Sequence, residues 1–175
     1  PFFYGQDDDG IVEYYRAVAS VSDLPFFIYN LPEATGVEIT PDLAQKLQDG
    51  VPRLAGLKHS ALTFDNIRIF ANMGLVVLNG FGTLMLPALV IGAAGCVDGP
   101  LSMAPELWVD TWNLYQAGDM DKAKKAEKRA CEVYDLILDF GYHQTLKAVL
   151  SERLGVDCGA PRRPTLPLSS EQNKD

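Results

Sequence analysis

Four short apolar segments, spaced at regular intervals along this 175-residue chain, constrain its fold more than any other feature. They cover residues 25–30, 54–59, 75–79 and 95–98. Continuous apolar runs of this length are typical of strands that are buried on both faces of a parallel sheet. Successive segments begin roughly 20 to 29 residues apart, which leaves room for one helix and two short loops. The pattern therefore predicts repeated strand–helix units.

Helix signals lie between these segments. Thr40 precedes Pro41, a pairing typical of a helix start, and predicts a helix over residues 41–48. A similar start at Thr63 predicts a helix that ends at Gly74. Repeated units of this kind build either an open doubly wound sheet or a (β/α)8 barrel. No G-x-G-x-x-G sequence or P-loop follows any strand, so the nucleotide-binding sheet lacks its usual signature.

The pattern changes after the fourth segment, where helices follow one another. Apolar residues recur at helical spacing within residues 107–115, 123–140 and 146–154. Residues 159–175 are polar and rich in proline. We therefore expect three successive helices and a surface tail.

The charge and the ligand-type residues exclude several classes of partner. The chain has 15 basic and 23 acidic residues and a net charge of -8, which argues against binding to a phosphate backbone. No run approaches ~18 uninterrupted apolar residues, which argues against a membrane span. Cys96, Cys131, Cys158, His59 and His143 stand at no metal-ligand spacing. Isolated thiols suit a reducing, cytoplasmic location.

In a barrel, the reacting groups lie at the carboxyl ends of the strands. Tyr29 and Lys58 stand near the ends of the first and second segments, and neighbouring strands are ~4.8 Å apart, so the two side chains are expected to meet. A lysine withdrawn from water favours its neutral amine, which can attack a ketone and form a Schiff base. A phenol beside it can carry the protons of that reaction. The alternative is that Lys58 reaches the surface and Tyr29 is a core aromatic.

Longer motifs around these two residues carry a family resemblance. The sequences FIYNLP at 27–32, TG at 35–36 and GLK at 56–58 resemble those of the N-acetylneuraminate lyase/dihydrodipicolinate synthase family. Three further stretches are similar to the family's fourth-strand end, eighth strand and C-terminal motif: PFFY at 1–4, GAAGCV at 92–97 and GAPRRP at 159–164. The resemblance covers nearly all of the chain, in order.

The resemblance implies a class I pyruvate-dependent aldolase in which Lys58 forms the Schiff base with pyruvate and Tyr29 relays protons. Substrate-binding residues implied in the same way are Thr35, Gly36, Gly80, Gly82, Thr83, Val97 and Gly99. The substrate would be a small 2-oxo acid, with no metal or other cofactor. The family also implies a cytoplasmic homotetramer.

The family's fold implies a division of the chain into three parts. Residues 1–101 would form the C-terminal half of a (β/α)8 TIM barrel, from the end of strand 4 to strand 8, with about four parallel strands. Residues 102–158 would form a three-helix extension, and residues 159–175 a Pro-rich polar tail. The family holds the pyruvate carboxylate with a turn of its second strand, so we expect these 175 residues alone to show little or no lyase activity.

Departures from the family pattern bear on the substrate. Ala34 stands where dihydrodipicolinate synthases have an arginine, which disfavours their acidic substrate. Gly82 and Thr83 stand where sialic acid lyases have an acidic pair, and Gly99 where a serine is expected. The leading hypothesis is a lyase that cleaves sialic acid or a related 2-oxo sugar acid to pyruvate and an aldehyde. The alternatives are another 2-oxo acid aldolase or hydro-lyase of the synthase type, and a non-catalytic truncated paralogue.

Overall fold

The computed structural model describes residues 4–172, and the chain divides into two compact units, residues 1–97 and 98–175. The stretch 1–4, expected to end a strand, lies outside the described residues except for Tyr4, which is in a bend and is exposed. The elements of the first unit are α1 (Asp8–Ala19), β1 (Phe26–Asn30), α2 (Pro32–Thr35), α3 (Pro41–Gly50), β2 (Leu54–His59), α4 (Asn66–Asn72), β3 (Val76–Asn79), the 3-10 turn η1 (Gly82–Leu84), α5 (Met85–Val90) and β4 (Gly95–Cys96).

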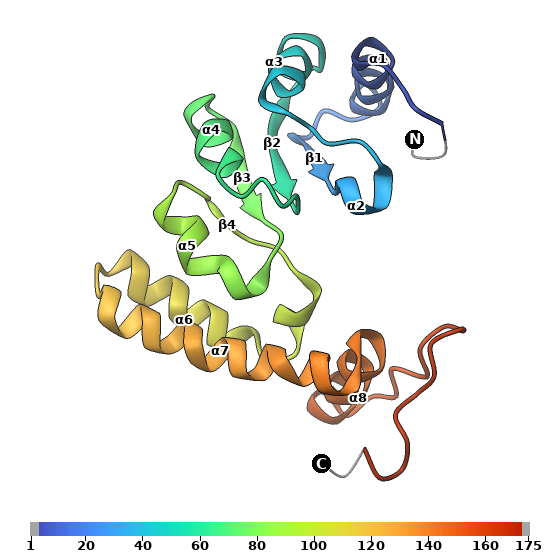
Figure 1. Ribbon diagram of the computed structural model, residues 1–175, viewed down its shortest axis with the longest axis vertical. Coiled ribbons are helices and arrows are strands. Elements are labelled where there is room, and N and C mark those ends of the chain that lie inside the picture. The colour runs from blue at the N-terminus through green and yellow to red at the C-terminus, as the bar shows by residue number, and fades with distance from the viewer. Residues whose placement is uncertain (1–3, 173–175) are drawn as a thin grey trace. The chain divides into compact units, whose positions relative to one another are not determined.

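The strands form one parallel sheet in the order β1-β2-β3-β4, so each strand pairs with the next one in the sequence (Figure 1). A doubly wound sheet reverses its strand order at a switch point, whereas the strands of a (β/α)8 barrel follow one another around the ring. The observed order therefore has the topology of a barrel segment. It confirms the predicted set of four parallel strands.

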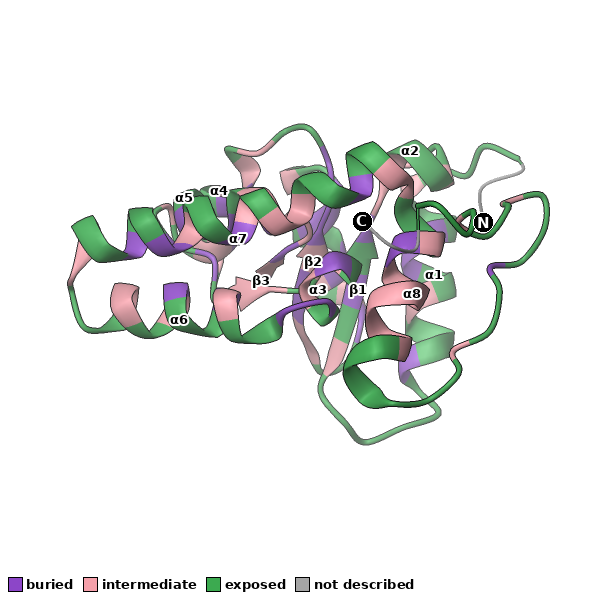
Figure 2. Cartoon of the chain, turned by 90° about the horizontal axis from the view of Figure 1, so that it is seen from below, coloured by how far each residue is buried: buried purple, intermediate pink, exposed green. Residues whose placement is uncertain are grey.

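Within the described part of the first unit, helices cover one face of this sheet, and no helix of that unit covers the other, which we call the open face. Ile28, Leu57 and Val77 are buried on the same face of their strands and belong to the apolar core. The core also takes residues from α1, α3 and α4, including Leu47 and Phe70, which are fully buried. Figure 2 shows the resulting alternation of buried and exposed positions along the chain. The opposite face of the sheet carries the side chains that remain accessible.

The helical boundaries follow the sequence signals closely. The Thr40 side chain accepts a hydrogen bond from the Leu43 amide, as expected of an N-cap, although α3 extends through Gly50 rather than ending at 48. The fourth strand is shorter than the predicted 95–98, because the Asp98 carboxylate accepts the Gly99 amide and begins the next turn instead. The short helices α2 and α5 were not predicted.

The second unit contains η2 (Gly99–Ser102), α6 (Pro105–Gln116), α7 (Met120–Phe140) and α8 (Tyr142–Leu154), which confirms the expected three helices. Helices α6 and α7 lie side by side (Figure 1), and a stripe of alanines on α7, among them Ala123 and Ala130, is fully buried. Arg153 of α8 donates to both carboxylate oxygens of Glu106 of α6, at 2.8 and 3.0 Å. This hydrogen-bonded ion pair lowers the pKa of Glu106.

Candidate active site

The carboxyl ends of β1 and β2 bring the two expected catalytic residues together. The strand register pairs Tyr29 with Lys58, and the Lys58 Nζ atom lies 4.3 Å from the centre of the Tyr29 ring. Both side chains lie on the open face of the sheet, where Lys58 is half-buried and Tyr29 is 44% exposed. A lysine ammonium over an aromatic face is attracted by the ring quadrupole. The geometry therefore presents an accessible amine beside a phenol.

Ser60 adds a third polar group to this pair. Its side chain is buried, and its hydroxyl donates to the phenolic oxygen of Tyr29 at 3.4 Å. Ser60 stands two residues beyond Lys58, so the alternation of an extended backbone puts it on the same face of the sheet. Sequence reasoning missed Ser60, although that spacing of two was a usable signal. The phenol thus lies between an amine and a hydroxyl.

Gly80, one of the expected substrate-binding residues, is placed against this group. Its amide donates to the carbonyl oxygen of His59 at 2.8 Å, which extends the β2–β3 pairing by one step. A β-carbon at Gly80 would lie 1.8 Å from the Ser60 Oγ atom. Only glycine fits there while Ser60 keeps its contact with Tyr29, so the backbone itself approaches the polar group.

Thr35 and Gly36 shape the loop that follows Tyr29. The Thr35 hydroxyl lies 3.0 Å from the carbonyl oxygens of both Leu31 and Val37, so it fixes the turn from inside. Gly36 ends α2 with a φ of 69°, a left-handed conformation that favours glycine. These two residues hold the shape of the loop beside the tyrosine.

The remaining expected residues divide between the two units. Gly82 is buried in η1, and Thr83 follows it in the same turn. The Val97 amide donates to the Asn79 carbonyl at 2.8 Å, and its side chain is 46% exposed. Gly99 begins η2 and belongs to the second unit. The first unit therefore gathers Tyr29, Lys58 and Gly80 at the ends of adjacent strands, whereas Gly99 is positioned by different elements.

A buried polar layer behind the site was also missed from the sequence. Asn30, His59 and Asn79 pair in register across β1, β2 and β3, and all three side chains are fully buried. The Asn79 side chain closes the next turn by bonding the amide and carbonyl of Phe81. Buried polar groups of this kind need hydrogen-bond partners to be tolerated. Their strand-end positions, one step out of phase with Tyr29 and Lys58, were the available signal.

The His59 ring is fully buried. Burial requires hydrogen-bond partners for its ring nitrogens, and it also shifts the pKa of the ring. Burial lowers the pKa of His59, while its hydrogen bond with the Thr63 carbonyl and the nearby Glu38 and Asp65 carboxylates act in the opposite direction. The ring also lies edge-to-face with Phe70, with the ring centres 5.5 Å apart. The imidazole is therefore held neutral inside the core.

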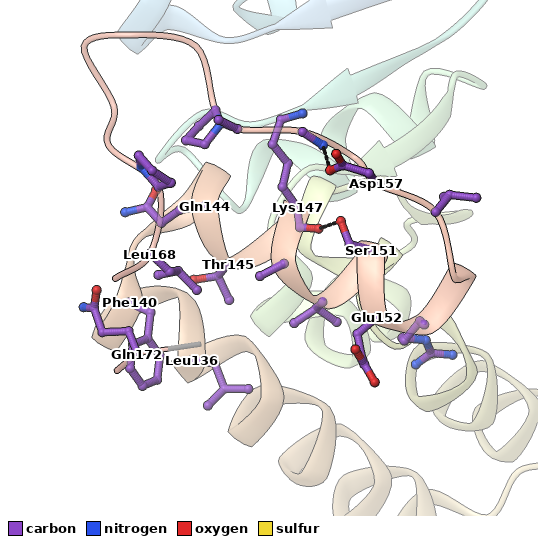
Figure 3. A pocket seen from close by; sticks show the side chains of 18 of the residues that line it. Leu136, Phe140, Gln144, Thr145, Lys147, Ser151, Glu152, Asp157, Leu168 and Gln172 are labelled. Carbon is purple, nitrogen blue, oxygen red and sulfur yellow. Dashed lines mark hydrogen bonds between the residues drawn. The ribbon is translucent and has the colours of Figure 1, made fainter. Parts of the chain in front are cut away.

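The helical unit contains a separate pocket of about 960 Å³ between α8 and the C-terminal tail (Figure 3). Its lining includes Leu136, Thr145, Lys147 and Leu168 and none of the expected site residues. The polar atoms of Lys147 and Ser151 are bonded to the backbone within the unit. The Thr145 hydroxyl is buried without a hydrogen-bond partner. Sequence reasoning gave no sign of this pocket.

Residues 4–172 offer neither a metal-binding cluster nor a membrane-spanning helix. No cluster of three or more His, Cys, Asp or Glu residues in this range could hold a metal ion. No helix there combines the length and the apolar character that crossing a bilayer requires.

Comparison with known proteins then decides the family. Residues 1–175 match the sequence profile of the dihydrodipicolinate synthetase family. The chain belongs to this family. An uncharacterized DapA-like lyase of Halobacterium salinarum is 32% identical over 173 residues, which cover 98% of this chain and 56% of that protein. A 4-hydroxy-tetrahydrodipicolinate synthase of Archaeoglobus fulgidus is 27% identical, over 99% of this chain and 61% of that protein.

A solved structure extends the comparison with the dihydrodipicolinate synthetase family to the fold. The Ruminococcus gnavus sialic acid aldolase superposes with a TM-score of 0.91 at 26% identity, over 99% of this chain and 60% of that one. The family and the parallel strand order together confirm the expected fold class, a segment of a TIM barrel with a helical extension. The chain spans little more than half the length of the family members that it matches.

Proposed function

We propose that this chain carries the Schiff-base lysine, Lys58, and the proton-relay tyrosine, Tyr29, of a pyruvate-dependent lyase. The observation that supports this most directly is the 4.3 Å separation between the Lys58 Nζ atom and the Tyr29 ring at the ends of adjacent strands. Membership of the dihydrodipicolinate synthetase family supports the same reaction class. The proposal includes the substrate-binding roles of the residues named for the family above.

The reaction follows from the groups at these strand ends. The Lys58 amine attacks the 2-oxo carbon of the substrate and forms a carbinolamine, which loses water to give an iminium. The electron pair of the breaking C–C bond then flows into that iminium, and the released aldehyde forms as the adjoining hydroxyl loses its proton. The Tyr29 phenol gives its proton to the hydroxyl that leaves the carbinolamine as water, and the resulting phenolate accepts the proton of the substrate hydroxyl. The re-formed phenol then protonates the enamine carbon, and water hydrolyses the iminium to release pyruvate and the free Lys58 amine. The Ser60 hydroxyl, which donates to the phenolic oxygen at 3.4 Å, stabilises the negative charge of the phenolate.

We propose sialic acid or a related 2-oxo sugar acid as the substrate, cleaved to pyruvate and an aldehyde. Two observations favour it over the acidic substrate of a synthase. The sialic acid aldolase of Ruminococcus gnavus matches closely in structure, and Ala34 offers no guanidinium beside Tyr29. The second candidate is an aldolase or hydro-lyase of the synthase type, supported by the Archaeoglobus fulgidus relative. A cytoplasmic homotetramer without a metal cofactor rests on the family alone.

Trapping with borohydride tests this proposal. The protein, in the longest form that its gene encodes, is incubated with pyruvate and sodium borohydride, and the peptides are mapped by mass spectrometry. Hydride addition to the imine carbon is expected to leave one pyruvate adduct, as a secondary amine, on the Lys58 peptide. The peptide of Lys46, an exposed lysine of α3, provides the internal control. Absence of any adduct at Lys58 would contradict the Schiff-base role and favour a non-catalytic paralogue.

Replacing Tyr29 with phenylalanine is expected to slow pyruvate release by about a hundredfold, because proton transfer by a positioned group contributes roughly 10²–10⁴-fold. The ring that lies against Lys58 is retained, so borohydride trapping with pyruvate should change less than turnover. The measurement compares pyruvate release from N-acetylneuraminate with adduct formation in both proteins. Turnover equal to that of the unchanged protein would assign the proton relay to another group.

A further inference from the structure

Asn30 and His59, the residues directly after Tyr29 and Lys58, form a hydrogen-bonded link between β1 and β2. The strand register pairs Asn30 with His59, and both are fully buried on the covered face of the sheet. The Asn30 amide nitrogen lies 3.1 Å from the His59 Nδ1 atom. Each member of the link is therefore one backbone step from a proposed catalytic residue, on the opposite side of the same strand.

The partners of this link define its orientation. The Ile39 amide donates to the Asn30 Oδ1 atom at 3.0 Å, and the Asn30 side-chain nitrogen donates to the Ile39 carbonyl at 3.2 Å. This arrangement fixes which end of the Asn30 amide is the nitrogen, and its second hydrogen is then donated to His59. The Nδ1 atom must accept that hydrogen, so the proton of the neutral imidazole resides on Nε2. The Nε2 atom donates it to the Thr63 carbonyl at 3.1 Å.

The link ties two loops to the strand ends. Ile39 belongs to the loop after β1, and Thr63 belongs to the loop after β2. The Thr63 hydroxyl in turn donates to the Glu38 carboxylate, which connects the same two loops on their outer side. The His59 carbonyl accepts the Gly80 amide at 2.8 Å, so the third strand joins at the same residue. Movement of the imidazole would therefore shift the loops and strand ends that carry the proposed site.

We propose that His59, in its neutral Nε2–H form, is a positioning residue that holds Lys58 and Tyr29 in the mutual geometry required for the reaction. This inference rests on the proposed function for its kinetic consequence. The structural part of the inference is that the Asn30–His59–Thr63 link sets the Lys58–Tyr29 contact, and this part does not depend on the proposed function. Protonation of Nδ1 would place a hydrogen against the donating Asn30 amide and break the link.

The direction of the pH effect follows from burial. Because burial lowers the pKa of His59, the folded protein binds this proton less readily than the unfolded chain, whose histidine has its ordinary pKa of about 6.5. The stabilisation by the link is complete above that ordinary pKa and is lost as the pH falls through the lower folded value. The charged groups that face the ring, Glu38 and Asp65, reduce this effect without reversing it.

Two substitutions separate positioning from simple packing. Glutamine in place of His59 offers an acceptor for Asn30 and a donor for Thr63 but has no titratable group. Leucine offers neither the acceptor nor the donor. We expect His59→Leu to lower the rate of pyruvate trapping at Lys58 by at least about tenfold, because misplacement of reacting groups by 1 Å costs up to about a hundredfold. His59→Gln should restore most of that rate. The same exchange at the exposed His143 of α8 is the matched control.

The pH dependence and an activity-independent readout complete the test. As the pH is lowered from 7 toward the pH at which the protein unfolds, the trapping rate of the unchanged protein should fall relative to that of His59→Gln. The nuclear Overhauser contact between the Lys58 side chain and the Tyr29 ring should disappear in His59→Leu and persist in His59→Gln.

If the unchanged protein forms no adduct while this contact still depends on His59, the proposed function fails and the positioning role stands. A rate ratio that stays constant down to the pH of unfolding, or a contact that survives in His59→Leu, would overturn the inference. If His59→Leu does not fold, the pH comparison decides.

Discussion

Replacing Lys58 with methionine is expected to reduce both pyruvate trapping and pyruvate release to background. Methionine preserves most of the side-chain length but offers no amine, so no carbinolamine can form and the covalent route is closed. The fold should be retained, because the Lys58 side chain is only half-buried. Loss of an exposed cation–π contact, of the kind that Lys58 makes with Tyr29, costs only about 0.5–1 kcal/mol.

The matched control for this substitution is Lys46→Met in α3. Lys46 also loses a favourable contact, since its amine donates to the Asp8 carboxylate at 2.8 Å, but it lies outside the proposed site. We expect Lys46→Met to trap pyruvate at the rate of the unchanged protein. Circular dichroism verifies that both variants are folded. Residual turnover in Lys58→Met above that of a heat-inactivated sample would exclude Lys58 as the essential amine.

Replacing Gly56 with alanine is expected to destabilise the protein by about 3 kcal/mol, the upper end of the usual cost of overpacking. A β-carbon at Gly56 would lie 2.0 Å from the backbone carbonyl oxygen of Val76 and 2.7 Å from the Phe27 ring. The oxygen belongs to the neighbouring strand and cannot turn aside as a side chain would. The strands β2 and β3 must therefore move apart at Gly56, two residues before Lys58.

Gly95 in β4 supplies the comparison for Gly56. A β-carbon there would lie 3.5 Å from a Leu78 methyl group, an ordinary van der Waals contact. We expect Gly95→Ala to remain within about 1 kcal/mol of the unchanged protein, since alanine in a compatible backbone reduces the entropy of the unfolded chain. Urea unfolding monitored by tryptophan fluorescence and circular dichroism gives both values. Equal stabilities of the two variants would show that the β2–β3 contact adjusts freely.

The strands and their parallel pairing were predictable from local sequence, whereas the meeting of Lys58 with Tyr29 was expected from their strand-end positions together with the family resemblance. Apolar runs bounded by turn residues set the strands, and the similar position of both residues at their strand ends set the contact. The sequences of α2 and α5 gave no such signal, because helices of four and six residues are too short to show a helical period of apolar residues. Their formation depends on tertiary packing.

The polar layer behind the site was not predicted from the sequence for a different reason. Asn30 and His59 resemble loop residues at the end of an apolar run, and only the register between strands decides that they face each other in the core. Ser60 likewise gains its meaning from Tyr29, which is 31 residues away in the chain. The spacing of these residues indicates which face they share, whereas their hydrogen-bond partners follow from the pairing of strands that are distant in the sequence.

The two faces of the sheet have a consequence for how such a protein can diverge. Along β1 and β2, residues that face the helices, such as Ile28 and Leu57, alternate with residues that face outward, such as Phe27 and Lys58. An exchange on the outward side alters what a ligand meets while leaving the core packing intact. A lineage can therefore acquire a new substrate through single replacements of outward side chains, without first acquiring compensating changes in the core; Gly56, which has no room for a β-carbon, is an exception.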